Sequence, residues 1–91
     1  MIDLFVDIQH SPEAVLISPR VVSAQPLHYR LSVTRGGVSG VATLEQQGEI
    51  ASGIAPSSVR LSLNEGDSCQ VLFEVLRDGV VLQFLEQPCQ P

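Results

Sequence analysis

Apolar and polar residues alternate with a period of two along almost the whole chain, and this pattern constrains the fold most. In the segment VRLSL, for example, Val59, Leu61 and Leu63 are apolar, whereas Arg60 and Ser62 are polar. Successive side chains of a β-strand point to opposite faces, so such a segment predicts a strand with one buried face. Helix-length segments with 3.6-residue apolar spacing are missing, and we therefore expect an all-β chain.

The predicted strands are short and are separated by turn signals at intervals of about 8–12 residues. They cover residues 2–9, 13–24, 27–34, 39–47, 48–54, 59–64, 69–77 and 80–87. Pro19 predicts an edge position or a bulge in the second strand, and Gly48 suggests a bend between the fourth and the fifth. Connections are expected at 35–37, 55–58, 64–67 and 78–79. Seven or eight strands in 91 residues predict a single domain, 1–91, with an immunoglobulin-like antiparallel β-sandwich fold.

Charge and hydropathy exclude several classes of partner. The net charge of −5 argues against binding to nucleic acid. No apolar run reaches the roughly 18 residues of a membrane span, so no membrane partner is expected. The segment after Met1, IDLFVDIQ, lacks the features of a signal peptide. If the protein is exported, we expect this sequence to be the mature chain with an added Met1.

The chain offers few groups for catalysis. His10 follows a predicted strand beside Ser11 and Pro12, and His28 alternates with core residues, so both are expected to face solvent. Phosphate-binding glycine loops are absent. Two cysteines and two distant histidines lack the spacing of a zinc site. We therefore expect a protein that is not an enzyme and that carries neither a metal nor a cofactor.

Cys69 and Cys89 form an even count in a small domain, which predicts one disulfide and an oxidising compartment. A two-residue turn at 78–79 fixes the register of the last hairpin. The pairs that follow are Phe73 with Phe84, Val75 with Leu82, and Cys69 with Pro88. Because Cys89 is one residue out of this register, we expect a bulge near Pro88. The alternative is a redox-active thiol pair, which requires solvent exposure and a lowered thiol pKa.

All five cationic side chains are arginine, and lysine is absent. Arg30 and Arg60 occupy outward positions of two predicted strands. With Arg20 or Arg35 nearby, they would form a positive patch that attracts acidic chains, most strongly at low salt. In the alternative interpretation, the arginines reflect a compositional bias and pair with surface carboxylates, which stabilises the fold little.

Three stretches resemble the curli assembly chaperones of the CsgC/CsgH type. They are GVSGVATLEQQGEIA, then VRLSLNEGDSCQVLFEVLRDGVVL, and a terminal Gln-Pro, and the resemblance covers residues 15–88. The CsgC type carries a Cys-x-Cys pair at the start of its third strand. Here the corresponding segment, AQPLHYRLSV, has no cysteine. A redox role based on that pair therefore has no support, and Cys69 and Cys89 look like those of the CsgH branch.

The resemblance implies a periplasmic immunoglobulin-like sandwich that keeps the curli major subunit from forming amyloid before export, and we expect the protein to be a monomer. It implies transient, electrostatically guided binding of this client, for which we select Arg30, Arg60, Arg20 and Arg35 as the contact residues. One alternative is a structural or adhesive module of a secreted assembly, which would bind its partner stoichiometrically. The other is the thiol-redox protein using Cys69 and Cys89.

Overall fold

The computed structural model describes residues 2–38, 40–50 and 57–90, and this part of the chain contains strands, turns and loops but no helix. The strands in it are β1 (Asp3–His10), β2 (Ala14–Val22), β3 (Leu27–Gly37), β4 (Gly40–Ile50), β5 (Val59–Ser62), β6 (Ser68–Arg77) and β7 (Val80–Pro88). The all-β prediction is thus confirmed. Within the described ranges, no helix long and apolar enough to cross a membrane is found.

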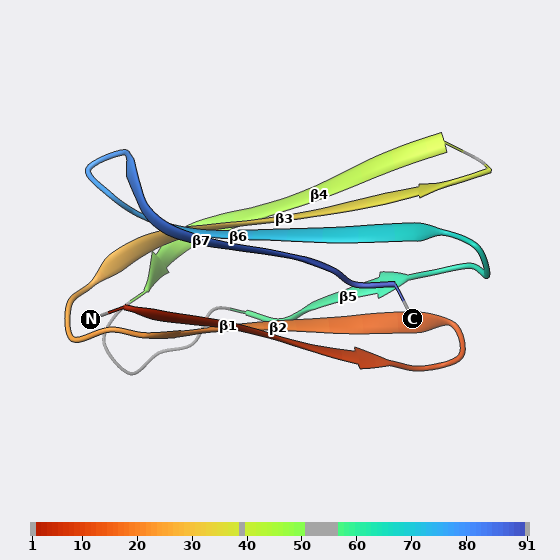
Figure 1. Ribbon diagram of the computed structural model, residues 1–91, viewed down its shortest axis with the longest axis horizontal. Helices are drawn as coiled ribbons and strands as arrows, with labels where there is room; N and C mark the ends of the chain where they lie inside the picture. The colour runs from red at the N-terminus through yellow and green to blue at the C-terminus, as the bar shows by residue number, and fades with distance from the viewer. Residues whose placement is uncertain (1, 39, 51–56, 91) are drawn as a thin grey trace.

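The strands form two antiparallel sheets that lie against each other as the layers of a sandwich (Figure 1). One sheet has the order β1-β2-β5, and the other has the order β4-β3-β6-β7. The predicted antiparallel β-sandwich is therefore confirmed. Each sheet has one inner face toward its partner and one outer face toward solvent, as the period-two pattern requires.

The core comes mainly from the inner faces of β2, β3 and β6, whose alternate residues are buried. Its largest fully buried side chains are Phe73, Ile17, Leu31, Val15, Val33, Val71, Val75, Cys69 and Cys89. Tyr29 packs edge-on against Phe73, with 6.3 Å between ring centroids. Burying each large aliphatic or aromatic side chain contributes about 1.5–3 kcal/mol, so these three strands supply most of the hydrophobic stabilisation.

The hairpin of β6 and β7 has the predicted turn but a different register. Asp78 and Gly79 have positive φ angles of 53° and 77°, as a two-residue hairpin turn requires. Leu76 pairs with Val81, but Val75 pairs with Gln83, which leaves Leu82 as an extra residue in β7. The bulge therefore lies next to the turn, and the predicted bulge near Pro88 is wrong.

This bulge shifts every later pair of the hairpin by one residue. Phe73 lies opposite Leu85 rather than Phe84, and Gln70 rather than Cys69 lies opposite Pro88. Continued by one residue, the same register places Cys89 opposite Cys69. A bulge reverses the alternation of a strand, so Cys89 points into the core, where it is fully buried.

The hairpin of β3 and β4 also differs from the prediction. β3 continues through Arg35 to Gly37, where a turn was expected, because Arg35 and Gly36 still pair with β4 and β6. β4 continues through Gly48 in unbroken register with β3, so no strand boundary falls there. A Cβ at Gly48 would lie 3.3 Å from Cε1 of Tyr29, so this glycine makes room for the tyrosine ring. The rest of the predicted strand 48–54 and the start of the loop 55–58 lie outside the described residues.

Among the described residues, the part of β2 that contains Pro19 has a paired strand on one side only. Pro19 lies opposite Val6 of β1, whereas β5 pairs only with Ala14 to Ile17. A proline cannot donate a ladder hydrogen bond, so it fits where no second strand is paired. The predicted edge position is confirmed for this part of β2.

Candidate functional site

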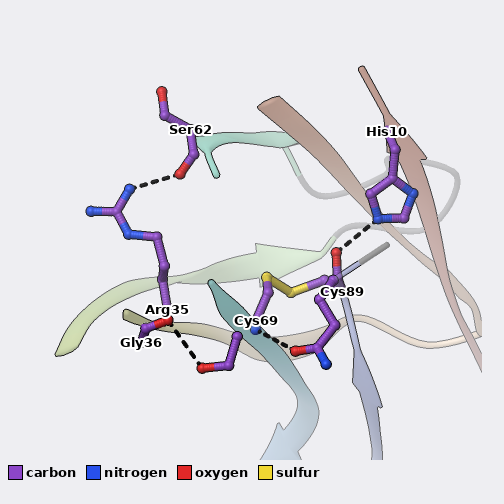
Figure 2. The surroundings of a disulfide bond; sticks show 8 residues. His10, Arg35, Gly36, Ser62, Cys69 and Cys89 are labelled. Carbon is purple, nitrogen blue, oxygen red and sulfur yellow. Dashed lines mark hydrogen bonds between the residues drawn. A yellow bond between two sulfur atoms is a disulfide. The ribbon is translucent and has the colours of Figure 1, made fainter. Parts of the chain in front are cut away.

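Cys69 and Cys89 form a disulfide that joins β6 to the chain directly after β7 (Figure 2). Their Cα atoms are 4.9 Å apart, and the N–H of Cys89 donates a 2.9 Å hydrogen bond to the carbonyl of Cys69. The two residues are only 2% and 0% exposed. The predicted disulfide is confirmed, and its burial is the opposite of the exposure that a redox-active pair needs.

His10 holds the end of β1 against the C-terminal segment. Its Nε2 lies 2.9 Å from the carbonyl oxygen of Cys89, to which it donates a hydrogen bond (Figure 2). We expected a solvated turn histidine here, and nothing in the sequence signals a contact between positions 79 residues apart. His28 faces solvent as predicted, with its Nε2 3.9 Å from Oε1 of Glu49.

A hollow of about 740 Å³ opens at the end of the sandwich, between His10, Ser11, Asn64, Asp67 and Gln90. Several of its polar groups take part in local hydrogen bonds. The carboxylate of Asp67 accepts the N–H of Asn64 at 3.0 Å, and Oε1 of Gln90 accepts the N–H of Cys69 at 2.9 Å. Across the described ranges, no group of three or more acidic, histidine or cysteine side chains is arranged to hold a metal ion.

Arg30 lies on the outer face of the four-stranded sheet and is paired with an acid. Its Nε donates a 2.8 Å hydrogen bond to Oε1 of Glu74, the residue opposite it on β6. That hydrogen bond, together with the charge of Glu74 and then of Glu45, raises the pKa of the Arg30 guanidinium, although desolvation acts against it. The register also places Glu49 and Glu86 on this face. Most of the positive charge of Arg30 is thus offset locally.

Arg20 and Arg60 lie on the opposite side of the molecule, on the outer face of the three-stranded sheet. The guanidinium carbon of Arg20 is 4.6 Å from the ring centroid of Phe5, which is itself 40% exposed. Arg60 is exposed and lies opposite Leu16. Asp7 belongs to the same face, so the surface combines both signs of charge with an exposed aromatic ring.

Arg35 bridges the two sheets at one side of the sandwich. Its Nη1 donates a 2.7 Å hydrogen bond to the carbonyl oxygen of Ser62 at the end of β5 (Figure 2). The four selected arginines therefore do not converge. Arg30 and Arg60 belong to different sheets, whose outer faces point in opposite directions, so the predicted patch that joins them is wrong. Strand alternation predicts that both face outward but not which sheet each strand enters.

In the described part of the chain, the fold is a small β-sandwich clamped by a buried disulfide, and the four selected arginines lie on the two outer faces and at one side. No family model matches the chain, and no curated protein matches it significantly.

Solved structures do match it. The solution structure of R. palustris CsgH has a TM-score of 0.74 at 16% identity, covering 97% of this chain and 92% of that one. The E. coli curli protein CsgC has a TM-score of 0.73 at 18% identity, covering 100% of both chains. A putative β-galactosidase from Bacteroides fragilis has a TM-score of 0.51 at 16% identity, covering 93% of this chain and 15% of that one. The chain thus has the CsgC/CsgH-type fold that the sequence resemblance implied.

Proposed function

We propose that this protein is a curli accessory protein that acts as a non-enzymatic chaperone. It binds the amyloid-forming curli major subunit transiently and suppresses its nucleation before export. The proposal is carried by the likeness to CsgH and CsgC, which extends over nearly the full length of all three chains. The sequence resemblance to the same family, found independently in the order of the strand and turn motifs, supports it.

The buried disulfide supports a periplasmic location, because such bonds form and persist in oxidising compartments. The same burial disfavours the thiol-redox alternative. A chaperone of this kind works without a cofactor, since it needs only a surface that the client contacts and leaves.

Among the selected arginines, Arg20 and Arg60 are best placed to steer an acidic client. They share one face, and the stacked pair of Arg20 and Phe5 combines a positive charge with an apolar ring. Arg30 contributes less because Glu74 offsets its charge. Arg35 is held by Ser62 at the side of the sandwich. Attraction by such exposed charges acts on the encounter rate and weakens as salt is added.

The experiment is thioflavin-T fibrillation of a purified curli major subunit, with this protein added at far below one equivalent. We expect a long delay in fibril onset, because a chaperone that acts on rare nuclei need not match the subunit in number. Absence of any delay, even at one equivalent, would refute the chaperone function. Persistent incorporation of the protein into the fibres would favour the structural or adhesive module instead.

The double variant Arg20→Glu/Arg60→Glu tests the face. We expect it to shorten the delay more than Arg30→Glu does, while circular dichroism shows that both variants remain folded. Equal delays for the folded double variant and the unmodified protein would remove Arg20 and Arg60 from the client site.

A further inference from the structure

Each edge strand of the three-stranded sheet accepts a side-chain hydrogen bond from the other sheet. Gln87 of β7 donates a 3.3 Å hydrogen bond to the carbonyl of Val6 in β1. Arg35 of β3 donates to the carbonyl of Ser62, and β5 is only 4 residues long. Short strands and covered edges are devices that prevent pairing with a further strand.

The β7 edge of the four-stranded sheet is interrupted. The bulge at Leu82 breaks its register near one end, and Pro88 stands at the other end. Both a bulge and a proline disturb the row of backbone groups that an added strand would need. Three of the four sheet edges therefore carry a feature that opposes strand addition.

The β4 edge carries none of these features. β4 runs for 11 residues in unbroken register with β3, and its sequence GVATLEQQGEI has no proline, lysine or arginine. Within the described ranges, no strand pairs with its other side. In Figure 1, β4 forms the rim of the upper layer and, with β3, rises away from the lower layer at one end. Every second backbone N–H and C=O along β4 therefore points outward.

The two faces of β4 define what would fit beside it. On the inner face, Leu44 is 44% exposed although its partner Val33 is only 1% exposed, so the opposing sheet leaves this part of β4 uncovered. Further along the same face, Gln46 donates to the carbonyl of Ser57, and Ile50 is buried. On the outer face, the register places Glu45, Gln47 and Glu49 in one row. An added strand would cover Leu44 with one face and meet amide and carboxylate groups with the other.

We propose that β4 binds an extended polypeptide segment as a fifth strand of the four-stranded sheet. The segment alternates small apolar residues, which pack beside Leu44, with glutamine, asparagine or lysine, which face Gln47 and the two glutamates. Main-chain hydrogen bonds supply the affinity, and the alternate side chains supply the selectivity. A second copy of this chain fits poorly, because pairing through β4 would bring the glutamates of two outer faces into one continuous sheet.

This inference rests on the proposed function, because it names where an amyloid-forming client is held. Amyloid grows by adding strands to an open edge, with glutamine and asparagine ladders contributing. With a client strand paired to β4, the opposite edge of the same sheet would be β7, which is interrupted by the bulge and Pro88. The sheet could not grow past β7, so the protein would close one of the two edges at which a client nucleus adds strands.

The test uses the full-length ¹⁵N-labelled protein and a synthetic ten-residue peptide that alternates glutamine with valine and ends in lysine. We expect amide shift changes and slower hydrogen exchange along β4. A second peptide, N-methylated at every residue so that neither of its edges can donate, keeps the side chains, and we expect it not to bind. Binding of both peptides alike would show contact with a face and overturn the inference.

Leu44→Lys provides the variant, and Leu82→Lys is its matched control, because both leucines are 44% exposed. A lysine at the open edge opposes strand addition, so Leu44→Lys should weaken peptide binding at least tenfold, whereas Leu82→Lys should leave it unchanged. Equal binding by the two folded variants would refute the role of β4. If the protein binds the peptide but does not delay curli fibrillation, the binding site on β4 is supported and the proposed chaperone function is refuted.

Discussion

Replacing both cysteines by alanine removes a clamp whose contribution can be worked from its position. The disulfide closes a loop between residues separated by 20 positions. In the chain-entropy treatment, a loop of this length destabilises the unfolded state by about 3 kcal/mol. For a domain of this size, each kcal/mol shifts the Tm by about 4–8 °C. We therefore expect Cys69→Ala/Cys89→Ala to lower the Tm by roughly 12–24 °C.

Thermal unfolding followed by circular dichroism measures this change, and urea unfolding gives the same free energy through its midpoint. The unmodified protein in mild reductant is the matched control. Because both cysteines are buried, we expect its disulfide to survive and its Tm to stay unchanged. A double variant that loses less than about 5 °C would contradict the loop-closure argument. Rapid reduction of the folded protein would contradict the structural role assigned to the disulfide.

Two further substitutions test the core and the last hairpin by urea unfolding. Phe73 is fully buried, so Phe73→Ala should cost about 3–5 kcal/mol; a loss below about 1 kcal/mol would show that Phe73 is not central to the core. Gly79 has a φ of 77°, so Gly79→Ala should cost about 1–2 kcal/mol, and unchanged stability would show that the turn does not need a positive φ there.

The fold follows from the sequence to a large extent, because each strand of a sandwich has one buried face and therefore shows apolar–polar alternation in its own segment. The alternation in LHYRLSVT predicts the buried row of Leu27, Tyr29, Leu31 and Val33, and all four are buried in β3. Turn chemistry is equally local, so Asp78-Gly79 and the segment 64–67 are found where expected. Strand ends are less local, since β3 continues through Arg35 and Gly36 only because two neighbouring strands pair with them.

The candidate sites were less predictable because they depend on which strands share a sheet. Arg30 and Arg60 have the same local signature, an outward position between apolar neighbours, yet they face opposite sides of the molecule. The acid that neutralises Arg30 lies 44 residues away, and the carbonyl that Arg35 contacts lies 27 residues away. The open edge of β4 is likewise a property of the sheet order, which strand periodicity does not contain.

The bulge at Leu82 makes the disulfide a check on the assembly of the last hairpin. A hairpin that closed without the bulge would place Cys69 opposite Pro88 and turn the thiol of Cys89 to the outer face, away from its partner. Only the bulged hairpin brings both sulfurs into the core. Oxidation would then trap correctly registered chains and leave misregistered ones with free thiols, open to reduction and another attempt. In the folding of this protein, β6 and β7 would therefore pair first, and the disulfide would form afterwards, only in chains with the correct register.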